Sequence, residues 1–599
     1  MTFVAVVREI LKTEAKNDEI ALADSSPSAA GLRYQPETWR TRFAAAGWTP
    51  WIIIGLAVFL RFFWLGIKPP HFDEGINGWF VDQVMKNGFY KYDPTNYHGP
   101  LHFYVLLVSE ALFGRNVWAL RLPVVLVSIG CVWLCFKFEP LFGRTVSRIA
   151  ALAMAVSPGF IFYGRYSIHE VWLVLFSMMF ILGLLGLWKF GTPNYLWCAG
   201  MGVAGMILSK ETYIIHLICG ALAIPALMVS NALNPLPDAK PAKQTWTYVD
   251  LAIVIGVAIA AIVFFYSGTF FHWSGVKGIW QAYKPWFATG EQGHGHEKPW
   301  YYWLKLMAPS FEKGRADYLG YELPALAGIL LCLFCQSFKN FNLRYLAIYG
   351  IGTLIAYSYV NYKTPWCIIS LAWPFLFVFG AALTLVPLKY SLETYAASAA
   401  LLCVVLAWTI WQTVWINSDY TWLLALILGV AILLIVLRYQ RALYAMLAVP
   451  LCISLGSAVW LNYFHCTTDT EPYVYVQTYN DIFKLTKPLL QLARQNPAYH
   501  QLTGHLIRSS VYPLPWILGD FPNVGYYEHG NLPQNLDADF LLVQEDKIKE
   551  VESKLRNTYY TEPLTIRNYQ DPSKLYLSAK VFKKFFPNRS PDFVGKGSG

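Results

Sequence analysis

Four short groups of ionisable residues lie at the ends of long apolar stretches, where charged side chains are costly and often functional. They are His71, Asp73 and Glu74; Arg165, His169 and Glu170; Lys210 and Glu211; and Lys363. A carboxylate held there could take a proton from an acceptor hydroxyl, and lysine or arginine could stabilise a departing phosphate in a low-dielectric site. These residue types therefore suit group transfer from a lipid phosphate.

Asp73 and Glu74 are the candidate catalytic acids. Because they are neighbours, their side chains point in different directions on any regular element. We expect only one of them to act as the base, while the other binds a metal, pairs with a cation or caps a helix. A purely structural alternative for Asp73 is an N-cap or first-turn acid of the amphipathic stretch 76–85.

The composition describes the setting of these groups. The chain has 599 residues, of which 56% are hydrophobic and 14% charged, whereas a soluble protein has about 25% charged residues. Its apolar stretches are roughly 18 to 23 residues long, enough to cross about 30 Å of hydrocarbon. We expect a multi-spanning membrane protein, and we exclude a disordered chain, a disulfide scaffold and a soluble multidomain enzyme.

The net charge of +10 fits the basic residues of cytoplasmic turns. No basic stripe with interleaved aromatic residues is present, so nucleic-acid binding is not expected.

The elements that must position the four groups are thirteen predicted transmembrane helices. They lie near residues 48–67, 119–136, 147–163, 171–188, 194–209, 212–230, 249–266, 322–337, 345–361, 366–387, 393–415, 420–437 and 442–463. Basic residues in alternate turns place the N-terminus in the cytoplasm, and an odd number of spans places the C-terminus outside. All four groups then reach the outer interface of a multi-pass protein in the cytoplasmic (inner) membrane.

Three regions follow from this topology. Residues 1–46 are a cytoplasmic polar tail, residues 47–463 are the transmembrane domain with external loops 68–118 and 267–321, and residues 464–599 are an external (periplasmic) domain. The last region combines amphipathic helices at 481–494 and 547–555 with short strands at 506–511 and 540–543. This alternation predicts a small α/β domain.

A glycine-rich stretch at 290–297 contains His294, His296 and Glu297. Imidazole and carboxylate groups suit a divalent metal ion, although the spacing matches no closed zinc site. The alternative is a mobile, solvated loop over the active site. The sequence therefore leaves the cofactor unknown, with a divalent metal ion as one candidate.

Several motifs resemble those of a known family. Residues 71–75 (HFDEG), 97–101 (YHGPL), 120–123 (LRLP) and 210–211 (KE) resemble the start of the protein-mannosyltransferase-like membrane glycosyltransferases of the GT-C class. Three further runs at 296–302, 362–366 and 512–516 resemble a closer subfamily, the flippase-activity-associated membrane proteins of archaeal N-glycosylation pathways and their bacterial relatives.

This resemblance implies a helical bundle whose external first loop carries the catalytic carboxylate, with a polyprenyl-phosphate-linked sugar as donor. The acceptor would be an external glycan, lipid or protein. Asp73 matches the catalytic acid of the family, Glu74 is its neighbour, and His98 matches a pocket position. The chain departs from its relatives at 165–170, where they often have Arg and Asp, so Glu170 is expected only as a supporting polar contact.

The expected pocket comprises His71, His98, His102, Glu170 and Glu211, and the expected phosphate ligands are Lys363, Lys210 and Arg165. The alternative for the two lysines is an interfacial side chain whose ammonium reaches out of the apolar layer. The rival function is a flippase, or a flippase-associated protein, for lipid-linked sugars. No clear internal repeat is visible, and the ionisable residues gather at one face instead of the midplane, which favours the enzyme.

Overall fold

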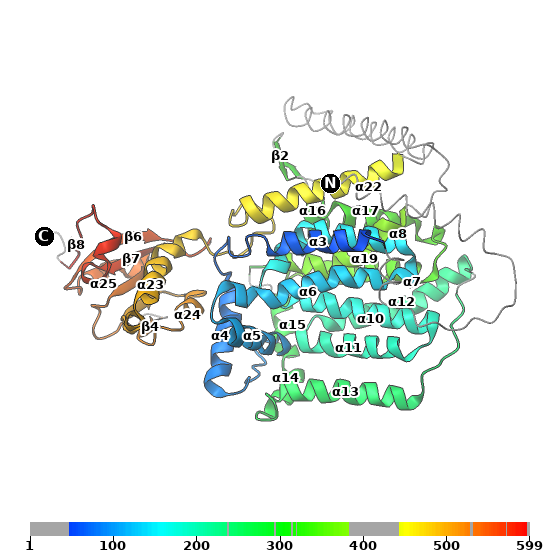
Figure 1. The fold of residues 1–599 in the computed structure, drawn as a ribbon, viewed down its shortest axis with the longest axis horizontal. Helices are drawn as coiled ribbons and strands as arrows, with labels where there is room; N and C mark the ends of the chain where they lie inside the picture. The colour runs from blue at the N-terminus through cyan, green and yellow to red at the C-terminus, as the bar shows by residue number, and fades with distance from the viewer. Residues whose placement is uncertain are drawn as a thin grey trace.

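The computed structural model describes residues 47–236, 239–292, 295–308, 310–312, 315–318, 320–382, 442–527, 531–568, 570 and 572–595. This part of the chain is mostly helical. A bundle of long helices is followed by a sheet-containing C-terminal region, which lies beyond the end of the bundle that carries α4 and α5 (Figure 1).

The bundle consists of α3 (Thr49–Phe62), α6 (Val117–Lys137), α8 (Arg144–Val156), α9 (Pro158–Phe162), α10 (Glu170–Phe190), α11 (Pro193–Ser209), α12 (Tyr213–Leu233), α13 (Tyr248–Tyr266), α17 (Leu323–Leu331), α18 (Phe341–Tyr359), α19 (Ile368–Ala381) and α22 (Ala442–Val459). Short helical pieces join them: α7 (Glu139–Phe142), η1 (Tyr163–Arg165), η2 (Cys332–Ser337), η3 (Pro365–Cys367) and the π-helix η6 (Trp460–Phe464).

Within the described residues, five helices are long and apolar enough to cross a membrane, and a sixth span arises if the bent pair Arg144–Val156 and Pro158–Arg165 is counted as one. Four shorter apolar helices accompany them. The chain is thus a multi-pass membrane protein. The count of thirteen spans is not confirmed, and the spans predicted at 393–415 and 420–437 lie outside the described residues.

The bend between α8 and α9 shows how the bundle tolerates a broken helix. Pro158 lacks a backbone N–H, and the two helices meet at an angle of 59°. Arg61 of α3 donates to the freed carbonyls of Met154 at 3.1 Å and Ala155 at 3.3 Å, and to the hydroxyl of Ser128 at 2.7 Å. A backbone acceptor in a hydrocarbon layer needs such a partner, so this buried arginine is structural.

The hairpin of α10 and α11 packs closely through glycine. A Cβ at Gly183 would lie 2.3 Å from the backbone nitrogen of Ala199, and one at Gly202 would lie 2.4 Å from that of Phe180. Small residues allow this approach where no hydrophobic force drives helices together inside a bilayer. The hairpin holds the start of α10 beside the end of α11, the two positions that carry Glu170 and Lys210.

The segments between the long helices form the end of the bundle that meets the C-terminal region. They contain α4 (Phe72–Asn87), α5 (Leu101–Phe113), α14 (Ser274–Gln281), α15 (Tyr283–Gln292), α16 (Tyr302–Met307) and the hairpin of β1 (Ser310–Glu312) and β2 (Arg315–Tyr318). Helix α4 ends at Gly88, whose φ of 79° terminates the helix in the left-handed conformation. The long helices thus support a set of short ones that carry the candidate residues.

The C-terminal region is built on a six-stranded sheet of order β4-β3-β5-β7-β6-β8. Its strands are β3 (Gly504–Ile507), β4 (Val524–Tyr527), β5 (Phe540–Gln544), β6 (Thr558–Leu564), β7 (Ser573–Ser578) and β8 (Asp592–Phe593). Strand β3 is parallel to β4 and β5, and the remaining pairs are antiparallel. The helical pieces are η7 (Asn480–Ile482), α23 (Phe483–Gln495), η8 (Pro497–Gln501), α24 (Leu514–Ile517), η9 (Glu545–Lys547), α25 (Ile548–Glu552), α26 (Ala579–Phe582) and η10 (Lys583–Phe585).

Helices cover both faces of this sheet. Leu485 of α23 packs with Leu542, whereas Val551 of α25 packs with Leu541 and Val543 on the other face, as the alternation of side chains along a strand requires. The prediction of a strand at 540–543 is confirmed. The strand predicted at 506–511 ends already at Ile507, and β6 and β7, which pair with each other, were not predicted.

Candidate active site

A cavity of about 760 Å³ opens where the segment between α3 and α6 meets the ends of the bundle helices. Residues from α4, the turn before α5, the start of α10, the turn between α11 and α12, α15 and the segment 357–367 line it. Five of the residues predicted from the sequence face this space: Asp73, His98, Glu170, Lys210 and Glu211. Segments far apart in the chain are therefore brought together as expected.

Asp73 lies in the first turn of α4, which His71 caps. The Nδ1 atom of His71 accepts the N–H of Asp73 at 3.1 Å, and the carboxylate of Glu74 accepts the N–H of His71 at 2.8 Å. These two bonds form a capping box. Because Nδ1 is an acceptor, Nε2 carries the proton and donates to the carbonyl of Tyr475 at 2.8 Å. The side chain of Asp73 is left 33% exposed towards the cavity.

Glu74 occupies the opposite side of the same turn and is 0% exposed. Its carboxylate accepts from Nε of Arg121 at 2.8 Å, from Nη2 of Arg121 at 2.7 Å and from the N–H of Ser167 at 2.9 Å. Burial acts to raise the pKa of Glu74, but Arg121 and the N–H of His71 outweigh it and lower the pKa to about 2. Glu74 therefore does not line the cavity; it pairs with a cation and caps a helix.

Two polar pairs, each with a buried carboxylate, lie in the cavity wall. Lys210, just after α11, donates to the carboxylate of Glu170 at the start of α10. Burial acts to lower the pKa of Lys210, but the carboxylate of Glu170 prevails and raises it well above its usual value. The carboxylate of Glu211 bonds Nδ1 of His98 at 2.9 Å. Burial acts to raise the pKa of Glu211, but His98 outweighs burial and lowers it. The carboxylate of Glu211 is thus held ionised.

Three histidine rings form a cluster at this wall. The ring centroid of His169 lies 4.6 Å from that of His98 and 4.6 Å from that of His102. His102 does not line the cavity; its Nδ1 accepts from Nε1 of Trp172 at 3.1 Å, so its Nε2 donates to the hydroxyl of Ser167 at 3.2 Å. His169 does line the cavity, and its buried Nε2 has no hydrogen-bond partner in the described part of the chain. That nitrogen is available to a substrate hydroxyl.

Two of the predicted phosphate ligands lie outside the cavity lining. Arg165 donates from Nη2 to the carbonyl of Trp64 at 2.7 Å. The ammonium of Lys363 donates to the carbonyl of Lys298 at 3.1 Å and to that of Val360. Backbone acceptors hold both cations, and of the lysines and arginines that the structure describes, only Lys210 lines the cavity.

The predicted metal ligands are only partly described. His296 bonds the hydroxyl of Tyr475 through Nδ1, and Glu297 is exposed and forms a backbone bridge with Tyr362. His294 lies outside the described residues. Among those that are described, no group of three or more histidine, cysteine, aspartate or glutamate side chains could hold a metal ion. The metal prediction therefore stays untested.

Sequence reasoning assigned no role to several residues that shape the site. Arg121 belongs to the LRLP motif, and an arginine near the start of an apolar helix calls for a buried partner, which is Glu74. Asn77 lines the cavity one turn after Asp73 and donates to the carbonyl of Ser167 at 2.8 Å. Its spacing of four residues from Asp73 was the available signal, because such residues share a helix face.

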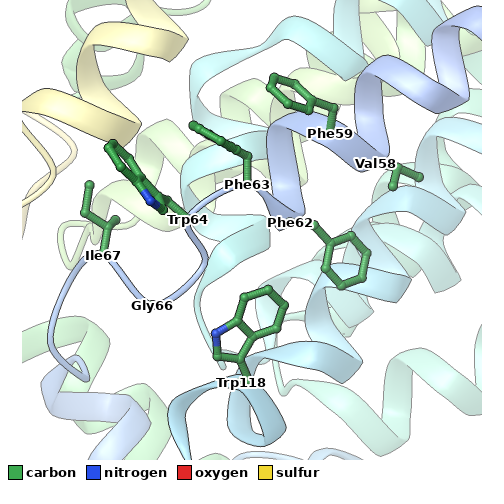
Figure 2. A pocket seen from close by; sticks show the side chains of 8 residues that line it. All are labelled: Val58, Phe59, Phe62, Phe63, Trp64, Gly66, Ile67 and Trp118. Carbon is green, nitrogen blue, oxygen red and sulfur yellow. The ribbon is translucent and has the colours of Figure 1, made fainter.

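A second pocket, of about 680 Å³, lies at the end of α3 (Figure 2). It is lined by Val58, Phe59, Phe62, Phe63, Trp64, Gly66, Ile67 and Trp118. Phe62 and Trp118 face it from α3 and α6 (Figure 2). No ionisable side chain borders it, so this pocket suits hydrocarbon and offers no group for proton or phosphate chemistry.

The helical bundle, with short helices at one end, is the fold of the GT-C class of membrane glycosyltransferases. The crystal structure of ArnT from Cupriavidus metallidurans bound to undecaprenyl phosphate superposes with a TM-score of 0.55 at 14% sequence identity, covering 89% of this chain and 98% of that one. The apo state of the same protein gives 0.54 at 14% identity, covering 90% and 99%. The fold predicted from the motifs is confirmed.

Sequence comparisons point to the same class. Residues 97–266 match the family described as dolichyl-phosphate-mannose-protein mannosyltransferase. The putative mannosyltransferase YkcB of Bacillus subtilis (strain 168) is 24% identical over 192 residues, 30% of this chain and 27% of the relative. The putative mannosyltransferase YycA of the same organism is 32% identical over 84 residues, 13% of this chain and 12% of the relative. The chain thus matches about a quarter of the first relative's length and less of the second.

Proposed function

We propose that this protein is a glycosyltransferase that moves a sugar from a polyprenyl-phosphate-linked donor to an acceptor at the outer face of the membrane. The observation that carries the proposal is the cavity itself, which joins a partly exposed carboxylate, Asp73, to a buried cation, Lys210. The similar fold of ArnT, crystallised with undecaprenyl phosphate, supports the choice of a polyprenyl phosphate as the leaving group.

In the proposed reaction, the carboxylate of Asp73 takes the proton of an acceptor hydroxyl. The acceptor oxygen forms a bond to the anomeric carbon of the sugar. The bond between that carbon and the phosphate oxygen breaks, and its electron pair leaves with the polyprenyl phosphate. Asp73 afterwards passes its proton to water. No change of oxidation state is involved.

Lys210 is the residue we assign to the departing phosphate. Its ammonium has three N–H groups, and the contact with Glu170 uses one of them. A buried cation that keeps its charge through a neighbouring carboxylate can still stabilise a second anion in a low-dielectric site. His98, His169 and Asn77 line the same cavity and would contact sugar hydroxyls.

The proposal includes the membrane topology expected from the sequence. We place residues 1–46 in the cytoplasm, residues 47–463 in the cytoplasmic membrane and residues 464–599 outside it. This topology places the cavity at the outer interface, where a lipid-linked donor and an external glycan, lipid or protein acceptor can both arrive.

Mass spectrometry of lipid-linked sugars in a strain that lacks the gene tests the function. We expect a polyprenyl-phosphate sugar to accumulate, the wild-type gene to reverse this, and Asp73→Asn to fail. Asp93→Asn is the matched control, since it makes the same change in the same loop away from the cavity lining. Full transfer by purified Asp73→Asn protein would refute the mechanism, and accumulation confined to the cytoplasmic leaflet would favour a flippase.

A further inference from the structure

The C-terminal region packs against the first two turns of α4, which carry Asp73. A Cβ at Gly75 would lie 2.4 Å from Cα of Pro513, and one at Gly78 would lie 2.2 Å from the ring of Trp516. The glycines therefore permit a contact that no larger residue would allow. The C-terminal region thus packs against the helix that carries Asp73, although none of its described residues lines the cavity.

Arg567 of the C-terminal region reaches the same turn. Its guanidinium lies 3.7 Å above the centroid of the Phe72 ring, and Phe72 is the residue directly before Asp73. The rings of Tyr512 and Phe72 also form a T-shaped pair, with centroids 5.8 Å apart. Nη2 of Arg567 donates to the hydroxyl of Ser510 at 3.1 Å. A cation above an aromatic face is attracted to it, so Phe72 is held between two residues of the C-terminal region.

The placement of this arginine is costly. It is only 9% exposed, and its Nη1 has no hydrogen-bond partner in the part of the chain that the structure describes. Burial lowers the pKa of Arg567 to about 10, the carboxylate of Asp73 acts to raise it, and the guanidinium of Arg508 acts to lower it. A buried charge without an ion-pair partner destabilises a fold, and an apolar side chain would pack on Phe72 without that cost.

We infer that Arg567 is a positioning residue for Asp73. The inference rests on the proposed function. Two other residues of the turn already have partners elsewhere. The carbonyl of Tyr475 accepts a hydrogen bond from the cap residue His71, and Arg121 pairs with Glu74. Arg567 fixes a third residue, Phe72, and places a positive charge near the carboxylate that takes the proton. The C-terminal region thereby completes the active site.

A charge-based role and simple packing predict different results for two substitutions. Arg567→Met keeps a long side chain on the Phe72 ring but removes the charge, whereas Arg567→Lys keeps the charge. Arg589→Met is the matched control, because Arg589 also lies over a ring, 5.8 Å from the centroid of Phe586, but on an exposed part of the same region.

The test measures the initial rate at which purified protein consumes the polyprenyl-phosphate sugar in membranes of the deletion strain, which hold donor and acceptor together. Binding of undecaprenyl phosphate is measured separately by native mass spectrometry, and thermal unfolding is recorded for each variant. We expect Arg567→Met to lower the rate about 10- to 100-fold, the size expected for a misplaced catalytic group. Its undecaprenyl phosphate binding should stay within about twofold of wild type, because Lys210, the proposed phosphate ligand, is untouched.

Arg567→Lys should recover most of the rate, and Arg589→Met should behave as wild type. A wild-type rate for Arg567→Met would overturn the inference. Equal losses in Arg567→Met and Arg567→Lys, each with a lowered unfolding temperature, would also overturn it and leave a packing role. If the wild-type protein itself consumes no donor, the proposed function fails instead, so the two failures are distinguishable.

Discussion

Replacing Glu74 with glutamine should weaken the first turn of α4 severely, because this carboxylate holds together three parts of the site. It accepts hydrogen bonds from Nε and Nη2 of Arg121, from the N–H of Ser167 and from the N–H of His71. The side chain is completely buried. Glutamine keeps one acceptor oxygen but removes the charge. Arg121 would then be buried without its counter-charge.

The size of the effect follows from the pKa of Glu74. A fall from the usual 4.5 to about 2 corresponds to about 3 kcal/mol of stabilisation at about 1.4 kcal/mol per pKa unit. Because the folded-state pKa is the lower one, this stabilisation is present at neutral pH and is lost as the pH falls from 4.5 through about 2. At pH 7, Glu74→Gln should therefore lower the free energy of unfolding by about 3 kcal/mol.

A double-mutant cycle measures the pair directly. Purified wild type, Glu74→Gln, Arg121→Met and the double variant would be unfolded in mixed micelles of increasing SDS fraction. The double variant should lose less than the two single variants together, because it leaves no unpaired buried charge. Glu545→Gln, an exposed acid of the C-terminal region, is the control. Additive losses, or a cost of Glu74→Gln below about 1 kcal/mol, would refute the reasoning, since such values are typical of exposed ion pairs.

Two further substitutions test other parts of the site. Gly78→Ala would place a Cβ 2.2 Å from the Trp516 ring, so we expect it to separate the C-terminal region from α4 and to speed proteolytic cleavage between them, whereas Gly55→Ala, with open space around it, should not. Lys210→Met should weaken binding of undecaprenyl phosphate about tenfold or more, as expected for a lost charge-assisted bond; unchanged binding in native mass spectrometry would exclude the ammonium as the phosphate ligand.

The fold was largely predictable from hydrophobic patterning. Long apolar stretches must cross the membrane whatever their partners, so each predicted span within the described residues corresponds to a helix. Pairing in the C-terminal sheet was not predictable in the same way. Strands β6 and β7 mix polar and apolar residues, and they form a sheet only because they pair with each other and β7 with β5. Such non-local pairing leaves a weak local signal.

The membership of the site was predictable only in part. Costly charges at the ends of apolar stretches indicated one region of the fold, and five predicted residues line a single cavity there. The sequence did not reveal which partner each charge has. Arg165 and Lys363 carry the right charge for a phosphate, yet nearby backbone carbonyls hold both of them. Arg567 lies almost 500 positions after Asp73, so only the folded chain shows that it packs on Phe72, the residue before Asp73.

The pairing of charges also explains which carboxylate can act as the base. Glu74 pairs with Arg121, Glu170 pairs with Lys210, and Glu211 bonds His98; each carboxylate would have to give up this partner before accepting a proton. Glu291 lines the cavity from α15 but is exposed. Water surrounds its carboxylate and competes with it as the acceptor of the hydroxyl proton. Asp73 is partly exposed, and Nδ1 of His71, which lies 3.7 Å from its carboxylate, already accepts a backbone N–H and carries no proton. Its oxygens are therefore the ones free to receive a proton from an acceptor hydroxyl.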